Sequence, residues 1–262
     1  MKKMLSLILI GLTLVAIGCQ PTPTPTAEVP EEAEPETAVI EEVEEVPSDL
    51  IGIVLPTKEE SRWLGDEAKF REIIEEKGYN AEILFSQNSS AIEKTNVETL
   101  ITKGAKVIIL CPYDATAAAA AVSDAEEAGI PVISYDRLIM DSADVDYYVT
   151  FDSIAVGAAQ AQYLVDQAGD TKGNNLYIYS GALTDNNSFL FFEGAWKVLQ
   201  PKISDGTFII RNSEKAVELS GKLELTREEM ASIMETIDTE WKQSVSKALA
   251  EAHLAANDAS AK

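Results

Sequence analysis

The strongest constraint on the fold is a glycine-led motif that occurs three times at nearly equal spacing. Each copy places a glycine between the end of a helical pattern and the start of an apolar run, and the copies begin at Gly78, Gly104 and Gly129. Glycine is a common residue just past the C-terminal end of a helix. The spacings of 26 and 25 residues suit one strand and one helix per unit. This alternation predicts an α/β fold built on an open parallel sheet.

The sequence around these motifs continues the same alternation. Residues 51–55 form an unbroken apolar run, which is typical of a strand that is buried on both faces. Residues 60–77 carry apolar residues at helical spacing. Further along the chain we predict strands near 146–150, at 175–180 and at 206–211, and helices near 154–168 and at 187–200.

One long amphipathic helix is predicted to follow the last of these strands. Its apolar face would hold Met230, Ile233, Met234, Ile237, Trp241, Val245 and Leu249. A helix of this kind needs a sheet to cover its apolar stripe, and no further strand pattern follows it. We therefore expect a second α/β unit that is incomplete in this chain.

The N-terminus has the pattern of a secretory signal. Lys2 and Lys3 precede an apolar run over residues 4–17, which is shorter than the roughly 20 residues that cross a bilayer. Residues 16–19 resemble the bacterial lipobox, which implies a lipoprotein signal peptide over residues 1–19 and a lipid on Cys19. This predicts a protein outside the cytoplasm, anchored to the bacterial membrane in the periplasm or on the cell surface. A short membrane anchor followed by an ordinary cysteine is the alternative.

Residues 20–48 form a segment of different composition. A Pro-Thr repeat at 21–26 is followed by nine glutamates up to Glu45, and no lysine or arginine lies between Lys3 and Lys58. Such a segment lacks the apolar residues needed to fold, while proline and like charges extend it. We predict a disordered Pro/Glu-rich stalk, with an acidic tail that binds a partner as the alternative.

Charge and cysteine content exclude several classes of function. The chain has 21 basic and 44 acidic residues, a net charge of -23 that repels phosphate backbones, so no nucleic acid partner is expected. A neutral ligand remains compatible with this charge. With Cys19 lipidated, Cys111 is left without an intramolecular disulfide partner. Because Cys111 closes the apolar run 107–110, we expect a buried, unreactive thiol.

Candidate binding residues follow the predicted strands at their carboxyl ends, where ligands bind in parallel α/β sheets. They are Arg62, Trp63, Asp136, Arg137, Asp185 and Asn187. Planar guanidinium, carboxylate and amide groups supply donors and acceptors for sugar hydroxyls, and an indole ring suits the apolar face of a sugar. Each residue also has a simpler explanation. Trp63 is alternatively packing at a helix start, Arg137 a surface ion pair and Asp185 a helix cap.

No arrangement typical of an enzyme is found in the sequence. His253 is the single histidine, so a catalytic triad or zinc site has no support, and we expect no metal and no cofactor. No phosphate-binding glycine motif follows a strand. Asp136 and Asp185 form a conceivable glycosidase pair, but their arginine and asparagine neighbours suit hydrogen bonds to a sugar better.

From about Ile51 to Ile210 the sequence resembles the periplasmic sugar-binding proteins of ABC importers, in the branch that binds xylose or several monosaccharides. The stretches that carry the resemblance are residues 61–63, 104–109, 135–139, 148–152 and 185–187. The resemblance implies the two-lobed type I solute-binding fold, with a first lobe at 49–151, a partial second lobe at 152–262 and a hinge crossing near 151–152. In that family the lobes close over the sugar.

The resemblance also implies a role for each candidate residue. These roles are hydrogen bonds to ring and hydroxyl oxygens from Arg62 and Arg137, stacking by Trp63, hydroxyl contacts from Asp185 and Asn187, and orientation of its neighbours by Asp136. We expect a monomer that binds a monosaccharide such as xylose or glucose and delivers it to an ABC permease. A sugar sensor of the same fold that signals to a chemoreceptor or kinase is the alternative.

Two departures from the family pattern bear on binding. Family members often carry a tryptophan after the strand that corresponds to 206–211, whereas residues 211–215 here contain no aromatic side chain, which puts the second stacking face in doubt. The family also continues through the rest of the second lobe, which supplies further sugar contacts. We therefore expect this chain alone to bind sugar far more weakly than a complete two-lobed protein.

Overall fold

The computed structural model describes residues 50–257. The predicted signal peptide, Cys19 and the predicted stalk lie outside these residues. None of the helices within the described range has the length and apolar character needed to span a bilayer.

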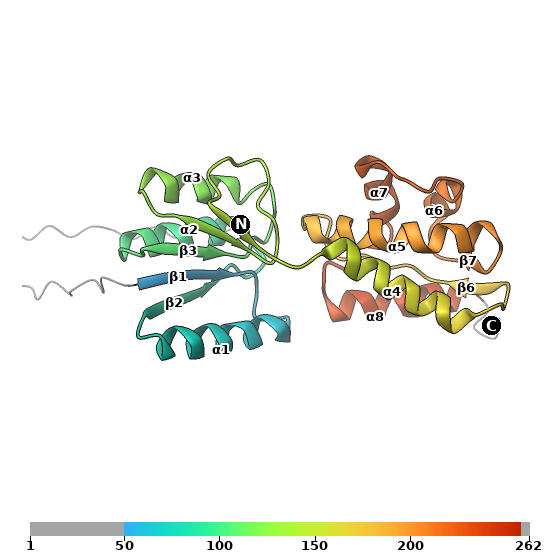
Figure 1. Ribbon diagram of the computed structural model, residues 1–262, viewed down its shortest axis with the longest axis horizontal. Coiled ribbons are helices and arrows are strands. Elements are labelled where there is room, and N and C mark those ends of the chain that lie inside the picture. Colours follow the sequence, from blue (N-terminus) through green and yellow to red (C-terminus); the bar gives the residue numbers. More distant parts are fainter. Residues whose placement is uncertain (1–49, 258–262) are drawn as a thin grey trace, which may run out of the picture. The chain divides into compact units, whose positions relative to one another are not determined.

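The first half of the described chain forms a five-stranded parallel sheet with the strand order β2-β1-β3-β4-β5. Its strands are β1 (Leu50–Leu55), β2 (Asn80–Phe85), β3 (Val107–Leu110), β4 (Val132–Tyr135) and β5 (Tyr147–Val149). Its helices are α1 (Ser61–Glu76), α2 (Ser90–Thr102) and α3 (Ala119–Glu127). Helices α2 and α3 lie on one side of the sheet and α1 on the other (Figure 1). This confirms the predicted α/β class.

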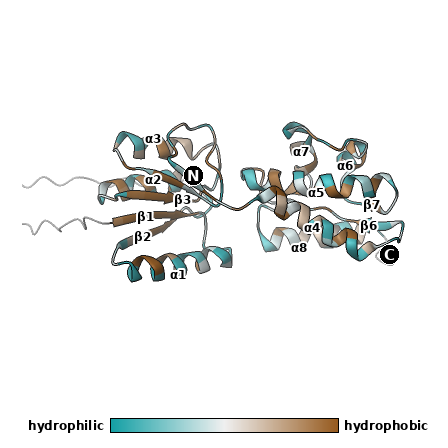
Figure 2. Cartoon of the chain, viewed as in Figure 1, coloured by the Kyte–Doolittle hydropathy of each residue, from teal (hydrophilic) through white to brown (hydrophobic). Residues whose placement is uncertain are grey.

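The apolar strands supply two cores because alternate side chains of a strand point to opposite faces. Val54 of β1 packs in the cluster under α2 and α3, while its neighbours Ile53 and Leu55 pack in the cluster under α1. Figure 2 shows β1 and β3 as strongly hydrophobic elements of this part. Cys111 lies in the second cluster, fully buried, and burial raises the pKa of its thiol, in line with the expected unreactive cysteine.

The predicted glycine stops mark real helix ends. Gly78 and Gly104 both have φ +76° and Gly129 has φ +70°, the left-handed region that favours glycine. Each directly precedes a strand or its approach, so each βα unit turns where the sequence pattern indicates.

The remaining described residues form a smaller parallel pair of strands covered by helices. The strands are β6 (Asn174–Leu176) and β7 (Phe208–Ile210). The helices are α4 (Ser153–Ala168), α5 (Asn186–Ser204), α6 (Glu214–Leu219), α7 (Arg227–Met234) and α8 (Gln243–Ala256). Their shared core includes Phe192, Trp196 and Ile233. Within the described residues the chain passes from the first sheet to this part once, through the exposed residues 150–152.

Helices α4 and α5 cross at very short range because each carries a glycine at the contact. A side chain on Gly157 would collide with the Phe191 carbonyl, and one on Gly194 would collide with the Ile154 carbonyl. The buried residues of α4 are accordingly small, namely Ser153, Gly157 and Ala161.

The prediction of one long helix over residues 230–249 is wrong. Helix α7 ends at Met234, and α8 begins at Gln243. Between them, the backbone of Ser180 bonds to the Ile237 carbonyl and accepts from the Thr239 N–H, so pairing with a distant segment replaces helical hydrogen bonds. The predicted apolar stripe is thereby divided: its first four residues enter the core, and α8 buries none.

Candidate functional site

A cavity of about 220 Å³, lined by charged, amide and aromatic side chains, lies at the carboxyl end of the first sheet and is also lined by residues of α5 and of the turn before α8. Its lining consists of Glu60, Arg62, Trp63, Asp136, Arg137, Phe151, Asp185, Asn187, Phe191 and Trp241. All six residues predicted from the sequence are among them. The convergence follows from the fold, because the segments that leave parallel strands meet at one edge of the sheet.

Trp63 lies at the start of α1, where it is both a core residue and a wall of the cavity. Its side chain is 1% exposed and packs with Ile53 and Leu55. The guanidinium carbons of Arg62 and Arg137 lie 4.5 Å and 5.3 Å from the centroid of its ring. The packing explanation is therefore correct, and Trp63 also belongs to the lining of the cavity.

Arg137 follows β4 and is 4% exposed, so it is not the surface ion pair considered as its alternative. Its Nε lies 3.2 Å from Oδ2 of Asp185, and its Nη2 lies 4.0 Å from Oε1 of Glu60. Its Nη1 donates to the Pro112 carbonyl at 3.3 Å. A buried guanidinium with two carboxylates and a carbonyl around it is a fixed donor in the lining of the cavity.

Asp136 has a left-handed backbone, with φ +62°, and uses both its side chain and its carbonyl. Its Oδ1 accepts from Nη2 of Arg62 at 2.6 Å. Its carbonyl accepts from Nδ2 of Asn187 at 3.0 Å and from Oγ1 of Thr150 at 2.9 Å. One residue therefore fixes two others that line the cavity.

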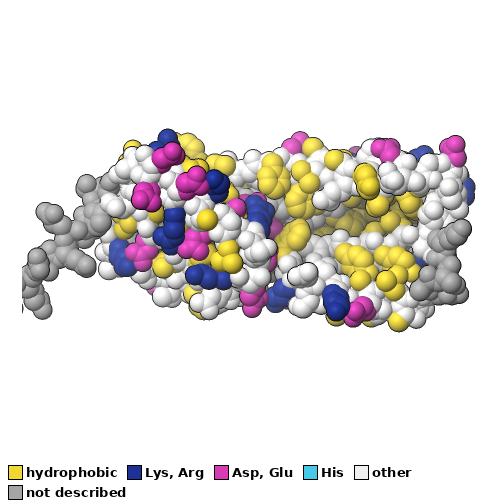
Figure 3. Space-filling view, turned by 90° about the horizontal axis from the view of Figure 1, so that it is seen from below, with side chains coloured by type: hydrophobic (Ala, Val, Ile, Leu, Met, Phe, Trp, Pro, Cys, Tyr) yellow, Lys and Arg dark blue, Asp and Glu magenta, His cyan; other side chains and the backbone are white. Residues whose placement is uncertain are grey.

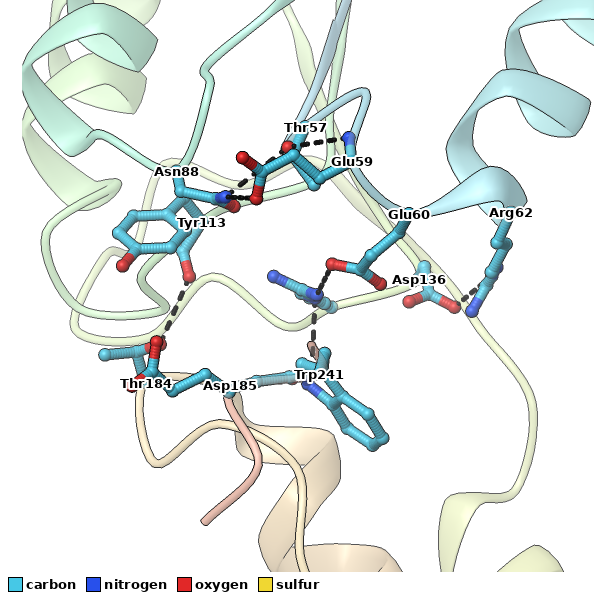
Figure 4. A network of polar contacts seen from close by, with 12 residues as sticks. Thr57, Glu59, Glu60, Arg62, Asn88, Tyr113, Asp136, Thr184, Asp185 and Trp241 are labelled. Carbon is cyan, nitrogen blue, oxygen red and sulfur yellow. Dashed lines mark hydrogen bonds and ion pairs between the residues drawn. The ribbon is translucent and has the colours of Figure 1, made fainter. Parts of the chain in front are cut away.

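Asp185 caps α5, as its simpler explanation states, and also forms an ion pair with Arg137. Its Oδ1 accepts from the Asn187 N–H at 2.9 Å, and its Oδ2 accepts from Nε1 of Trp241 at 3.0 Å. Burial raises the pKa of Asp185, and the positive charge of Arg137 opposes that rise. Burial likewise raises the pKa of Glu60, again opposed by Arg137. The cavity therefore gathers three carboxyl groups around two guanidinium groups (Figure 4).

Trp241 and Glu60 are site residues that the sequence reasoning missed. Trp241 adds a second indole ring to the cavity lining, and this ring meets Phe191 edge-on at 6.2 Å between centroids. Trp241 was assigned to a helix face, but Glu240 and Trp241 both have positive φ and form a turn. Its place four residues after Ile237 fits helical periodicity, so the sequence offered no signal for its role in the site. Glu60 lies only two residues before Arg62, so its place in the same segment was available from the sequence.

A larger cavity of about 510 Å³ lies among α4, α5, β6 and the start of α8, and no charged residue lines it. Figure 3 shows apolar side chains gathered in a hollow over this part of the chain. Its lining suits apolar atoms, whereas the smaller cavity offers the polar groups that orient a small ligand. Within residues 50–257 no group of three or more His, Cys, Asp or Glu side chains is arranged to hold a metal ion.

Comparison with known proteins identifies relatives that share this architecture. A match to the periplasmic binding protein domain family spans residues 51–261. The chain is 36% identical over 176 residues to the multiple sugar-binding periplasmic receptor ChvE of Rhizobium radiobacter, covering 66% of this chain and 50% of that protein. It is 32% identical over 156 residues to the D-xylose-binding periplasmic protein of Escherichia coli, covering 60% of this chain and 46% of that protein.

A solved structure shows the same likeness. The carbohydrate transporter solute binding protein of Chloroflexus aurantiacus, in complex with D-glucose, matches with a TM-score of 0.78 and 64% identity. The match covers 81% of this chain and 62% of that chain. The chain spans about half the length of the curated relatives described above. The relatives named here are binding proteins and a receptor rather than enzymes, and the chain belongs to the periplasmic binding protein domain family.

Proposed function

We propose that this chain binds a neutral monosaccharide of the glucose or xylose type in the cavity around Arg137, as the substrate-binding component of an ABC importer. The observation that carries the proposal is the convergence of the six predicted residues on one cavity. The relatives named for sugar or xylose binding, and the related structure with D-glucose, support the same class of ligand.

The chemistry of the cavity matches a polyol. A sugar hydroxyl both donates and accepts, and the cavity offers guanidinium donors, carboxylate acceptors and an amide that does both. Charge-assisted hydrogen bonds from such groups are short and directional, which favours one orientation of the ring. Trp63 and Trp241 add indole rings to the lining, and these suit the apolar C–H faces of a sugar.

In this proposal the two α/β parts act as the two lobes, and the sugar stabilises contacts between them. Arg137 and Asp136 leave the first sheet, whereas Asp185 and Asn187 belong to the start of α5. A sugar that bonds to members of both sets shifts the population toward the arrangement in which both are in reach. Delivery of the sugar to a permease would follow from recognition of that arrangement.

We further propose that the protein works outside the cytoplasm on a lipid anchor at Cys19. The supporting observations are the signal-like residues 1–19 and the periplasmic relatives. An acyl chain holds a protein at the membrane surface without a spanning helix.

Isothermal titration calorimetry with D-glucose and D-xylose tests the binding proposal. We expect heat of binding with at least one of them, and Arg62→Ala should weaken it by about 10- to 100-fold, the effect of losing a charged hydrogen bond. Arg62 is chosen because its side chain is 46% exposed, so its loss leaves the core intact.

Arg71→Ala is the matched control for this experiment. Arg71 lies on the same helix and pairs with Glu67 on the surface, away from the cavity. Its removal should leave the affinity unchanged. Equal affinity in the Arg62 variant and the wild type, or no binding of either sugar at millimolar concentration, would contradict the proposed site.

A further inference from the structure

We propose that Glu93, which lies outside the cavity, is a positioning residue whose ionisation strengthens sugar binding by holding the loop that follows β3. This inference rests on the proposed function, since it concerns the affinity of the same site. It adds a residue that does not line the cavity and, in the proposal, does not contact the sugar.

Glu93 lies on α2 and is 1% exposed, which is unusual for a carboxyl group. Its Oε2 accepts from the Tyr113 N–H at 2.7 Å and from the Ser86 hydroxyl at 3.2 Å. Its Oε1 is buried and has no hydrogen-bond partner among the described residues. The carboxyl group is thus tied to the rest of the protein through the loop after β3 and the end of β2.

The loop that Glu93 holds forms three hydrogen bonds, one with Arg137 of the site and two with Thr184. The Pro112 carbonyl accepts from Arg137, as described above. One residue on, the Tyr113 carbonyl accepts from Oγ1 of Thr184 at 3.4 Å. The Ala115 N–H donates to the Thr184 carbonyl at 2.9 Å. Thr184 directly precedes Asp185, so this loop contacts both the buried guanidinium and the segment that carries the second set of site residues. Figure 4 shows the contact between Tyr113 and Thr184.

The surroundings of Glu93 place its ionisation in the neutral range. Burial raises the pKa of Glu93 to about 7, against the opposing effect of the Tyr113 N–H, the Ser86 hydroxyl and the charge of Arg137. The carboxylate of Asp114 adds to the rise. Arg137 and Asp114 are the charged groups that act on it from neighbouring elements. A modest change in pH around neutrality therefore changes the charge on Glu93.

The direction in which Glu93 ionisation changes sugar affinity follows from the strength of its hydrogen bond with the Tyr113 N–H. A carboxylate accepts from an N–H about twice as strongly as a neutral carboxylic acid does. The ionised form therefore holds the Tyr113 N–H, and with it the Pro112 and Tyr113 carbonyls, most firmly. If the bound state needs the loop in this position, sugar binding favours the ionised form, and affinity falls as the pH drops through 7.

The affinity for D-glucose, measured by calorimetry from pH 6 to pH 8.5, tests this coupling. We expect about 2.5- to fivefold tighter binding at pH 8.5 than at pH 6, which corresponds to a ligand-linked fall of half to one pKa unit in Glu93. Glu93→Gln keeps the size and the acceptor oxygen but cannot ionise. The affinity of this variant for D-glucose should therefore stay constant between pH 6 and pH 8.5. Glu98→Gln, on the same helix with a side chain 53% exposed, is the control that should keep the pH dependence of the wild type.

A ligand-free readout separates this inference from the proposed function. The amide resonances of Tyr113 and Ala115 should shift with a midpoint near pH 7 in the wild type and stay constant in Glu93→Gln. Failure of D-glucose and D-xylose to bind at every pH would overturn the proposed function. A pH slope that persists in Glu93→Gln, or a Tyr113 amide that does not titrate, would overturn the role of Glu93.

Discussion

Arg137 joins three parts of the chain through one guanidinium group. It contacts Asp185 at the start of α5, Glu60 before α1 and the Pro112 carbonyl after β3. Arg137 and Asp185 have side chains only 4% and 3% exposed, so neither charge is compensated by water. Each of the two buried charges is therefore stabilised in the folded protein by the other.

Removing only the cation should destabilise the protein strongly. Arg137→Met leaves Asp185 buried without its partner, and breaking such a pair costs about 3–5 kcal/mol of the free energy of unfolding. In the double variant Arg137→Met with Asp185→Leu no buried charge is stranded, so the loss should be smaller than in Arg137→Met alone. Urea denaturation of the wild type, Arg137→Met, Asp185→Leu and the double variant measures both effects. Additive losses would show that the two charges do not depend on each other.

At this scale the sequence predicted which residues converge, but not what they contact. Arg62, Trp63 and Asp136 were found because each follows the carboxyl end of a strand, a position that chain order alone reveals. Their partners depend on distances between segments that are remote in sequence, as in the bond between Asn187 and the Asp136 carbonyl. Glu93 was missed because nothing in a helical pattern distinguishes a buried glutamate from an exposed one.

Among the elements, the crossing of α4 and α5 depends on two glycines. Gly157 and Gly194 let each helix contact a backbone carbonyl of the other, Phe191 and Ile154 respectively. Glycine in a helix is otherwise unfavourable, because it gives up more conformational freedom than alanine does. Close packing is therefore the physical reason for glycine at these positions.

Gly157→Ala should lower the free energy of unfolding, whereas Gly65→Ala should raise it. The new methyl group at 157 meets the backbone of α5, and overpacking of this kind costs about 1–3 kcal/mol. Nothing lies within 4 Å of the corresponding position at Gly65 in α1, so alanine there should add up to about 1 kcal/mol through helix propensity. Chemical denaturation compares the two. Equal effects would contradict close packing as the reason for Gly157.

The elements of the first sheet were predictable from the sequence, and the region between α7 and α8 was not. Apolar runs and glycine stops are local signals, and they located β1 to β4 and the helices between them. The break after Met234 depends instead on hydrogen bonds between Ser180 and residues 237 and 239, which are far away in the sequence. A periodic apolar pattern continues through the break, so periodicity favoured an uninterrupted helix.

For the molecule as a whole, a buried acid makes stability depend on pH. The folded-state pKa of Glu93 is raised from 4.5 to about 7, so the folded chain binds more protons than the unfolded chain between these values. The contribution of Glu93 to stability therefore falls as the pH rises from 4.5 to 7 and stays low above 7. Integrated over this range, the loss is about 3 kcal/mol.

Glu93→Gln removes this dependence, so the variant should gain stability relative to the wild type as the pH rises. The difference in the free energy of unfolding between variant and wild type should be more favourable to the variant by about 3 kcal/mol at pH 8 than at pH 4.5. Thermal or urea denaturation at the two pH values measures it. A difference that is the same at both would show that Glu93 ionises alike in the folded and unfolded chains.

The single passage through residues 150–152 means that the covalent chain joins the two parts at one exposed stretch within the described residues. A protease that cuts there would leave two fragments held together by non-covalent contacts, which include those of Arg137, Asn187 and Thr184. The fraction of fragments that remain associated would then depend on their concentration. Dilution would separate fragments that a bound ligand, by bridging both, would hold together.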